Sequence, residues 1–296
     1  NADGTLTGNT VGSALGTLSI TAFNLSTGVV SYSYTLDNNT SHPNADGANS
    51  VTDSFEITVF DRNGDSDIAS LDVTVVDDLP SIQPAELDEI PSLTVDETTL
   101  GTDASANFSG MFDGNYGADG AGETTYAVTL AAGVSEGDDS TLSTSDSTAI
   151  YLYINDDGAV EGRVGDEDGE VAFVVSVDAD GNVTLNQMMA LQHPDADDHD
   201  DPVSLAAGLL TLTATITDQD GDSDSTTLEL GDKLIFKDDG PAISLADNET
   251  PVPTLTVDET TLEGDASANF SSMFDGNYGA DGAGSTTYAV TLAANV

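Results

Sequence analysis

The fold class is decided by residues 210–217, which read Leu210-Thr211-Leu212-Thr213-Ala214-Thr215-Ile216-Thr217. Apolar side chains alternate with threonines over the whole stretch, so one face is apolar and the other is polar. Successive side chains of a strand point to opposite faces, and this period of two is therefore typical of a strand with one buried face. We predict a half-buried β-strand here.

The segment that follows, Asp218-Gln219-Asp220-Gly221-Asp222-Ser223-Asp224, predicts a turn into another strand. Asp-Gly is a favoured pair in tight hairpin turns, and it recurs at 157–158 and 180–181. Further apolar or alternating runs lie at 55–59, 71–75, 151–154 and 171–175, while helical periodicity is scarce. Many short strands with Asp-Gly turns predict an all-β protein built of tandem Ig-like antiparallel β-sandwich modules.

An internal repeat sets the domain organisation. Leu93-Thr94-Val95-Asp96-Glu97 recurs 162 positions later as Leu255-Thr256-Val257-Asp258-Glu259, and the near identity continues through the Tyr-Gly-Ala-Asp-Gly segments at 116–120 and 278–282. A weaker correspondence relates residues 61–67 to 218–224, 77–80 to 238–241, and His42-Pro43 to His193-Pro194. We therefore expect the later part of a diverged repeat at 1–79, a complete repeat of about 160 residues at 80–240, and the opening part of a further repeat at 241–296.

The charge balance is extreme, with 54 acidic residues, four basic ones and a formal net charge of −50. Self-repulsion at this charge opposes compaction, yet 38% of the residues are hydrophobic and lie in alternating runs, which argues against disorder. We therefore expect divalent cations to assist folding. Four basic residues are too few to bind nucleic acid or an anionic membrane surface, and no apolar run approaches the roughly 20 residues of a membrane-spanning helix.

The acidic hairpin loops are candidate calcium sites. A turn alone explains Asp220 and Gly221, but it does not explain four carboxylates within seven positions. Ca²⁺ takes roughly six to eight oxygen ligands, largely carboxylates and carbonyls, and would relieve the repulsion between them. The loop is not an EF-hand, because Gly221 stands fourth rather than sixth and strands flank it. We predict Ca²⁺ as the cofactor, with candidate ligands in both loops: Asp61, Asn63, Asp65, Asp67, Asp218, Asp220, Asp222 and Asp224.

Two kinds of acidic pair mark each repeat boundary. One kind ends the last strand of a repeat, and the other opens the first strand of the next. We expect carboxylates of neighbouring repeats to share calcium across the linker and stiffen it; a solvated linker is the alternative. The residues are Asp77, Asp78, Asp238 and Asp239, and then Asp96, Glu97, Asp258 and Glu259.

Other polar segments allow two interpretations. Asp113, Asn115 and Asp119 are equally compatible with ion ligands and with a glycine-rich loop that packs on the sandwich. His193 and His199 suggest a transition-metal site, but we favour a solvated acidic loop. Catalysis is not expected, because the chain has no Cys, no Gly-x-Ser-x-Gly and no His-Glu-x-x-His. Carboxylate pairs suited to a glycosidase are abundant, but they repeat with the modules beside turn glycines, as structural ion sites do.

In combination these motifs resemble a known family. Asp-x-Asp-Gly-Asp-x-Asp, followed about fourteen residues later by Asp-Asp-x-Pro, resembles the tandem Ig-like (VCBS-type and type I secretion target) repeats of giant repeats-in-toxin (RTX) bacterial adhesins. Residues 51–59 are similar to the penultimate strand of such repeats, and residues 116–122 and 190–194 look like the longer variety. Arg62 and Asn63 depart from the acidic pattern, which puts the ion of that loop in doubt.

The resemblance implies calcium-stabilised extender modules, exported by type I secretion to the bacterial cell surface, that support cell adhesion and biofilm formation. The implied partners are calcium ions and neighbouring repeats of the same chain, and the adhesion target is not identified. A glycan- or peptide-binding module within the same adhesin, acting through a loop such as 194–202, is the alternative. A pilus domain with a Lys–Asn isopeptide bond is a third interpretation, for which Lys233 and Lys237 are the only lysines.

Overall fold

The computed structural model describes residues 9–24, 26–42, 47–87, 89–246 and 251–291. It is nearly all β, with 47% of the residues in strands, and the predicted fold class is confirmed. The chain divides into two compact units: unit 1 holds Asn1–Glu86, Gly110–Tyr126 and Thr213–Thr227, and unit 2 holds Leu87–Ser109, Ala127–Leu212 and Leu228–Val296. Among the described residues, no helix has the length and apolar character to cross a membrane.

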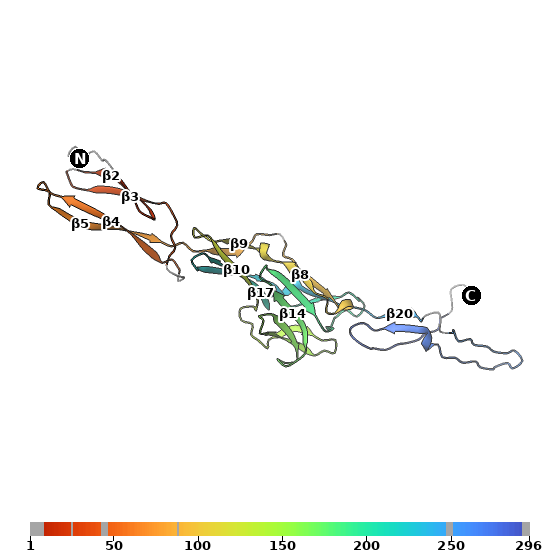
Figure 1. The fold of residues 1–296 in the computed structure, drawn as a ribbon. Helices are drawn as coiled ribbons and strands as arrows, with labels where there is room; N and C mark the ends of the chain where they lie inside the picture. Colours follow the sequence, from red (N-terminus) through yellow and green to blue (C-terminus); the bar gives the residue numbers. More distant parts are fainter. Residues whose placement is uncertain (1–8, 25, 43–46, 88, 247–250, 292–296) are drawn as a thin grey trace. The chain divides into compact units, whose positions relative to one another are not determined.

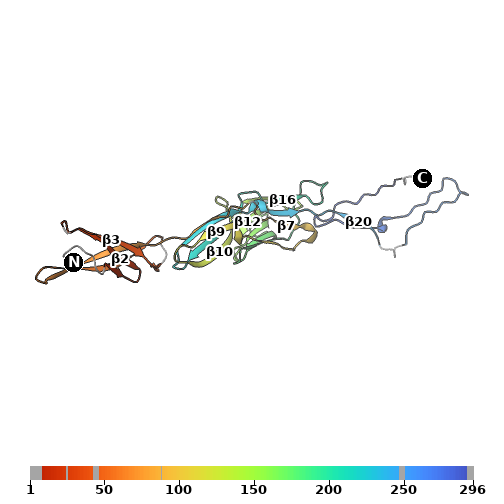
Figure 2. The ribbon, with the colours of Figure 1, turned by 90° about the horizontal axis from the view of Figure 1, so that it is seen from above.

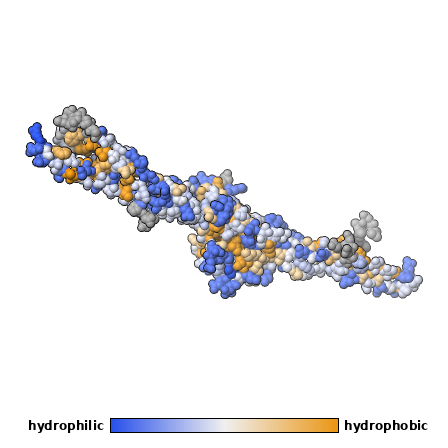
Figure 3. Space-filling model, viewed as in Figure 1, coloured by the Kyte–Doolittle hydropathy of each residue, from blue (hydrophilic) through white to orange (hydrophobic). Residues whose placement is uncertain are grey.

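The part of unit 1 that precedes residue 77 forms two small antiparallel sheets among the described residues (Figure 1). One has the order β1 (Thr10–Gly12), β2 (Gly16–Phe23) and β3 (Val30–Leu36), and the other is the hairpin of β4 (Ser50–Phe60) and β5 (Ser66–Val76). Leu18, Phe55 and Val75 are buried, and the rings of Tyr34 and Phe55 meet with centroids 6.1 Å apart. Other apolar side chains stay at the surface over β2–β5, where Figure 3 shows them gathered.

The stretch 210–217 forms the predicted strand. β17 (Leu210–Asp218) is the middle strand of a sheet with β10 (Ala121–Leu130) and β18 (Ser223–Glu229). Its four apolar side chains are at most 2% exposed, while the threonines between them are half-buried. The Asp220-Gly221 turn joins β17 to β18 as expected.

Unit 2 contains a larger sandwich (Figure 2). A six-stranded antiparallel sheet has the order β11 (Asp139–Ser143), β12 (Ala149–Ile154), β13 (Val160–Val164), β14 (Val171–Val177), β15 (Asn182–Gln187) and β8 (Ala104–Asn107). A three-stranded sheet has the order β16 (Pro202–Ser204), β19 (Leu234–Lys237) and β7 (Leu93–Asp96). Phe173 of the first sheet and Phe236 of the second are both fully buried, with ring centroids 5.3 Å apart, so the two sheets pack face to face.

One strand pair differs from the antiparallel expectation. β7 and β19 pair in parallel, with Leu93 opposite Leu234 and Asp96 opposite Lys237. Parallel neighbours need a long connection, and here almost the whole repeat lies between the two strands. The pairing places β7, near the start of the 80–240 repeat, beside β19, the last strand of that repeat.

The repeat is visible as structure. β6 (Ser81–Pro84) pairs with β9 (Phe112–Asn115) in unit 1, as β20 (Ala242–Leu245) pairs with β21 (Phe274–Asn277) in unit 2. A short 3₁₀ turn precedes the second strand of each pair, η2 (Ser109–Met111) and η4 (Ser271–Met273). The remaining 3₁₀ turns are η1 (Glu97–Thr99) and η3 (Gly231–Lys233).

Candidate metal centres

Carboxylates from three distant parts of the sequence converge in unit 1. Asp77 and Asp78 follow β5, Asp119 lies in the loop between β9 and β10, and Asp218 and Asp220 lie at the end of β17. Overlapping groups of three, including one that adds His42, place one potential ligand atom of each member within 4.8 Å of the others. We call His42, Asp77, Asp78, Asp119, Asp218 and Asp220 the first cluster.

Local backbone chemistry positions these side chains. One carboxylate oxygen of Asp218, Oδ1, accepts hydrogen bonds from the N–H groups of Gly221 (3.0 Å) and Asp222 (2.8 Å), which closes the β17–β18 turn. The Ala118 N–H donates to Asp78 Oδ2 at 2.7 Å, so the end of β5 holds the loop that carries Asp119. Gly117 has a φ of +78°, and a Cβ there would overlap the Asp78 carboxylate, so glycine is required at this position.

Several carboxylate oxygens of the first cluster are buried without a hydrogen-bond donor among the described residues. They are both oxygens of Asp77, Oδ2 of Asp218 and Oδ1 of Asp220, and the neighbouring Asp222 adds its Oδ2. Asp77 is 7% exposed and Asp218 is 4% exposed. In the described part of the chain no Lys or Arg forms an ion pair with the cluster. Arg163, Lys233 and Lys237 pair elsewhere, and Arg62 is exposed in the β4–β5 turn. Buried carboxylates without a Lys or Arg partner are unfavourable unless another cation binds them.

The pKa values reflect this repulsion. Burial, followed by the charge of Asp220, raises the pKa of Asp119 to about 6. Burial also raises the pKa of Asp77; the charges of Asp220 and Asp222 add to it, and His42 acts in the opposite direction. The pKa of Asp218 is raised by burial and by its contact with Asp220. Each shift means that ionised carboxylates are disfavoured here, and a divalent cation would reverse that preference.

A second cluster in unit 2 has a related composition. Glu97, His193 and Asp238 form one converging group, and Asp238, Asp239 and Asp281 form another. Glu97 Oε1 accepts hydrogen bonds from Gln187 Nε2 at 2.8 Å and the Leu191 N–H at 2.7 Å, and it lies 3.2 Å from His193 Nε2. We call Glu97, His193, Asp238, Asp239 and Asp281 the second cluster.

The pKa directions in the second cluster have similar causes. Burial raises the pKa of Asp238, and the charge of Glu97 adds to it against the effect of His193. Burial and the charges of Asp238 and Asp239 raise the pKa of Asp281. Burial alone would lower the pKa of His193, but the hydrogen bond and charge of Glu97 outweigh it and raise that pKa.

The two clusters correspond through the repeat. Four members match in pairs: His42 with His193, Asp77 with Asp238, Asp78 with Asp239, and Asp119 with Asp281. Even the loop contact is repeated, since the Ala280 N–H donates to both oxygens of Asp239, and a Cβ on Gly279 would overlap that carboxylate. The clusters differ in burial, because Asp119 is buried and Asp281 is exposed. Recurrence of one arrangement in two units indicates that the repeat encodes it.

The structure separates the predicted ligands into three groups. Asp77, Asp78, Asp218, Asp220, Glu97, Asp238 and Asp239 belong to the converging clusters, and Asp222 borders the first one. Two others bind backbone: Asp96 Oδ1 accepts the Thr98 N–H at 2.9 Å, and Asp224 Oδ2 accepts the Ile82 N–H at 3.0 Å. The third group is exposed, and among the described residues no member joins a converging carboxylate group: Asp61, Asn63, Asp65, Asp67, Asp258 and Glu259.

Sequence reasoning missed part of both clusters. Asp119 is equally compatible with two roles in the sequence, and Asp281 is not among the predicted ligands. The prediction of a solvated loop around His193 is wrong for its side chain, which is only 3% exposed, whereas His199 is exposed. The paired His-Pro motifs at 42–43 and 193–194 were the available signal, because both histidines recur at equivalent positions of the repeat.

The comparison with protein families agrees with this repeat register. A family model described as a domain of unknown function (DUF5801) matches residues 92–231 and 254–296. The chain belongs to this family. The two matches begin 162 positions apart, which is the offset of the repeat. No curated protein and no solved structure matches the chain.

The residues of each cluster lie partly inside and partly outside the family matches. Asp119, Asp218 and Asp220 lie within the first match, and Asp281 lies within the second. Asp77, Asp78, Asp238 and Asp239 lie in the segments that precede each match. Glu97 and His193 of the second cluster also lie within the first match. Each match therefore covers only part of a cluster, and the segment before it contributes two of the carboxylates.

Proposed function

We propose that this chain consists of calcium-stabilised extender modules of a secreted bacterial surface adhesin, in which Ca²⁺ at the repeat boundaries stiffens the chain and supports cell adhesion and biofilm formation. One observation carries the proposal. Carboxylates converge where one predicted repeat ends and the next begins, and several of their buried oxygens have no hydrogen-bond donor among the described residues. Asp77 and Asp78 come from the earlier repeat, and Asp119, Asp218 and Asp220 come from the later one.

The donor set of the first cluster suits calcium. Five carboxylates supply oxygen ligands, and Ca²⁺ prefers hard oxygen ligands in a flexible arrangement. Mg²⁺ demands a stricter octahedron and gives up its water reluctantly, so a dense carboxylate group favours the larger ion. The formal net charge of −50 adds a general electrostatic preference for divalent cations.

Ion binding here would restrict the chain at the boundary. Ions bound by the two overlapping groups that share Asp119 would link the end of β5, the β9–β10 loop and the β17–β18 turn. The groups are Asp77–Asp78–Asp119 and Asp119–Asp218–Asp220. Ordering these three segments in the cation-free protein would bring like charges together, so the bound ion supplies the free energy that holds them. A spacer function follows if successive boundaries are stiffened in this way.

The rival ligand-binding function has less support. Residues 194–202 contain no Phe, Tyr or Trp that would stack on a sugar or peptide. Their carboxylates are used locally, since Asp201 Oδ2 accepts the Asp195 N–H at 2.9 Å and Asp200 pairs with Lys237 at 2.6 Å. This loop matches an acidic surface turn better than a recognition platform.

Small-angle X-ray scattering with and without Ca²⁺ tests the spacer function. We expect a longer and better-defined maximum dimension in Ca²⁺ than in EDTA, because ions at the boundaries remove hinge motion. Asp220→Asn should reduce the difference, whereas Asp65→Asn, in an exposed hairpin loop, should leave it unchanged. An identical scattering profile in Ca²⁺ and EDTA would refute the proposal.

A further inference from the structure

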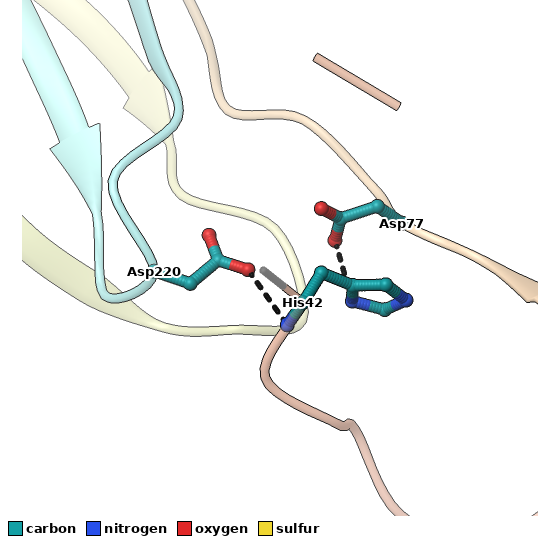
Figure 4. A group of neighbouring side chains, drawn as sticks. All are labelled: His42, Asp77 and Asp220. Atoms are coloured by element: carbon teal, nitrogen blue, oxygen red, sulfur yellow. Dashed lines mark hydrogen bonds and ion pairs between the residues drawn. The ribbon is translucent and has the colours of Figure 1, made fainter. Parts of the chain in front are cut away.

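Each cluster contains a buried histidine side chain that has no role in the calcium proposal. In the first cluster, His42 is 6% exposed, and its Nδ1 lies 3.0 Å from Asp77 Oδ1 (Figure 4). The backbone N–H of His42 donates to Asp220 Oδ2 at 3.3 Å, which ties Asp220 to the same residue. His42, Asp77 and Asp220 thus offer one nitrogen and two oxygen ligands within 4.8 Å of one another.

The His42 ring is buried with an ion-pair neighbour but without a hydrogen bond. Nδ1 lies 3.0 Å from Asp77 Oδ1, yet neither ring nitrogen and neither oxygen of Asp77 makes a hydrogen bond to any described residue. Buried polar atoms without hydrogen bonds are unfavourable, and native structures rarely leave them unsatisfied. A metal ion coordinated by the ring and the carboxylates would satisfy both side chains.

A related arrangement recurs in unit 2. His193 groups with Glu97 and Asp238, and its side chain is 3% exposed. Its Nε2 is hydrogen-bonded to Glu97 Oε1 at 3.2 Å, which differs from His42, and its Nδ1 has no hydrogen-bond partner within the described ranges. His193 corresponds to His42 and Asp238 to Asp77, while the third ligand changes from Asp220 to Glu97. His199, the third histidine of the chain, is exposed and belongs to no converging group among the residues described.

Ligand chemistry distinguishes these two histidine-containing groups from a calcium site. Imidazole suits Zn²⁺ and its neighbours in the first transition row, whereas Ca²⁺ takes oxygen ligands. One histidine and two carboxylates, with a position left for water, is a set that Zn²⁺ accepts. We propose that His42–Asp77–Asp220 and His193–Glu97–Asp238 are two transition-metal sites of the Zn²⁺ class. The alternative for each is a buried ion pair between a protonated imidazole and carboxylates, and this proposal does not depend on calcium binding.

Zinc binding to the full chain in calcium-free buffer tests the proposal. Calcium is left out because Asp77 and Asp220 are also ligands in the calcium proposal, and excess Ca²⁺ would compete for them. Equilibrium dialysis should find two Zn²⁺ bound per unmutated chain and two in the matched control His199→Gln. The His42→Gln and His193→Gln variants should each bind one. Histidine side-chain NMR of the unmutated chain provides a readout that needs no variant, and Zn²⁺ should shift the ring resonances of two of the three histidines. The proposal is overturned if His42→Gln and His193→Gln bind as much Zn²⁺ as the unmutated chain, or if Zn²⁺ shifts neither buried ring. A calcium titration without Zn²⁺ reports separately on the proposed spacer function.

Discussion

Asp77→Asn should have opposite effects on stability with and without calcium. The substitution keeps the shape of the side chain and removes its charge. Asp77 offers an oxygen within 4.8 Å of oxygens of Asp78 and Asp119. At this separation and an effective dielectric of about 20, two full charges repel by about 3.5 kcal/mol.

The net effect without calcium is smaller than this pairwise energy. Protonation of Asp119 and screening by nearby solvent reduce the repulsion, and His42 loses the carboxylate beside its Nδ1. We expect a gain of about 1–2 kcal/mol in the free energy of unfolding in EDTA, which corresponds to a rise in Tm of a few degrees. In Ca²⁺ the sign reverses, because unmutated protein gains about 2.7 kcal/mol at a calcium concentration about 100 times Kd and the variant loses much of it.

Calorimetry in EDTA and in Ca²⁺ measures both signs. Asp65→Asn is the matched control, because it removes the same charge from an exposed hairpin loop, and its effect should stay within about 0.5 kcal/mol in both buffers. A fall in Tm for Asp77→Asn of equal size in EDTA and in Ca²⁺ would refute the reasoning, since it would show a packing defect rather than relieved repulsion.

Three further predictions follow from the same structure. The pKa of Asp119 is raised from 3.8 to about 6, so the folded state binds the Asp119 proton more tightly than the unfolded state does. The Tm in EDTA should therefore fall as pH rises from 4 to 7. A Tm that rises over this range would contradict the raised pKa. In Ca²⁺ the ion needs ionised carboxylates, so the calcium contribution to Tm should grow over the same range. Gly117→Ala should weaken calcium binding more than Gly158→Ala does. Both glycines have a positive φ, but an added Cβ would overlap Asp78 at Gly117 and would meet open space at Gly158. Equal calcium affinities of the two variants in a titration would be inconsistent with the Asp78 contact. Phe173→Ala should lower stability by about 3–5 kcal/mol equally in EDTA and Ca²⁺, because it opens a cavity in the sandwich of unit 2; a calcium-dependent loss in calorimetry would contradict this.

Strand periodicity was sufficient to predict the fold class. The alternation at 210–217 places Leu210, Leu212, Ala214 and Ile216 in the core, because only a strand brings every second side chain to one face. The parallel pairing of β7 with β19 could not be predicted in the same way, since no local pattern relates residues 93–96 to residues 234–237.

The acidic hairpin motif alone does not predict the candidate metal site. The two acidic hairpin loops use the same local chemistry: Asp61 Oδ1 accepts the N–H groups of Asn63 and Asp65, as Asp218 Oδ1 accepts those of Gly221 and Asp222. Among the described residues, the second loop joins a converging carboxylate group and the first does not, because Asp77 and Asp119 approach the second loop from distant parts of the chain. The motif predicts a turn, whereas tertiary packing decides whether that turn forms part of a cation site.

Calcium titration calorimetry of the full chain in zinc-free buffer, followed by thermal unfolding in Ca²⁺ and in EDTA, tests the central claim most directly. The account predicts saturable binding that Asp220→Asn weakens and Asp65→Asn does not, together with a Tm several degrees higher in Ca²⁺. Absence of saturable binding, with the same Tm in Ca²⁺ and in EDTA, would contradict the claim that the converging carboxylates form a calcium site.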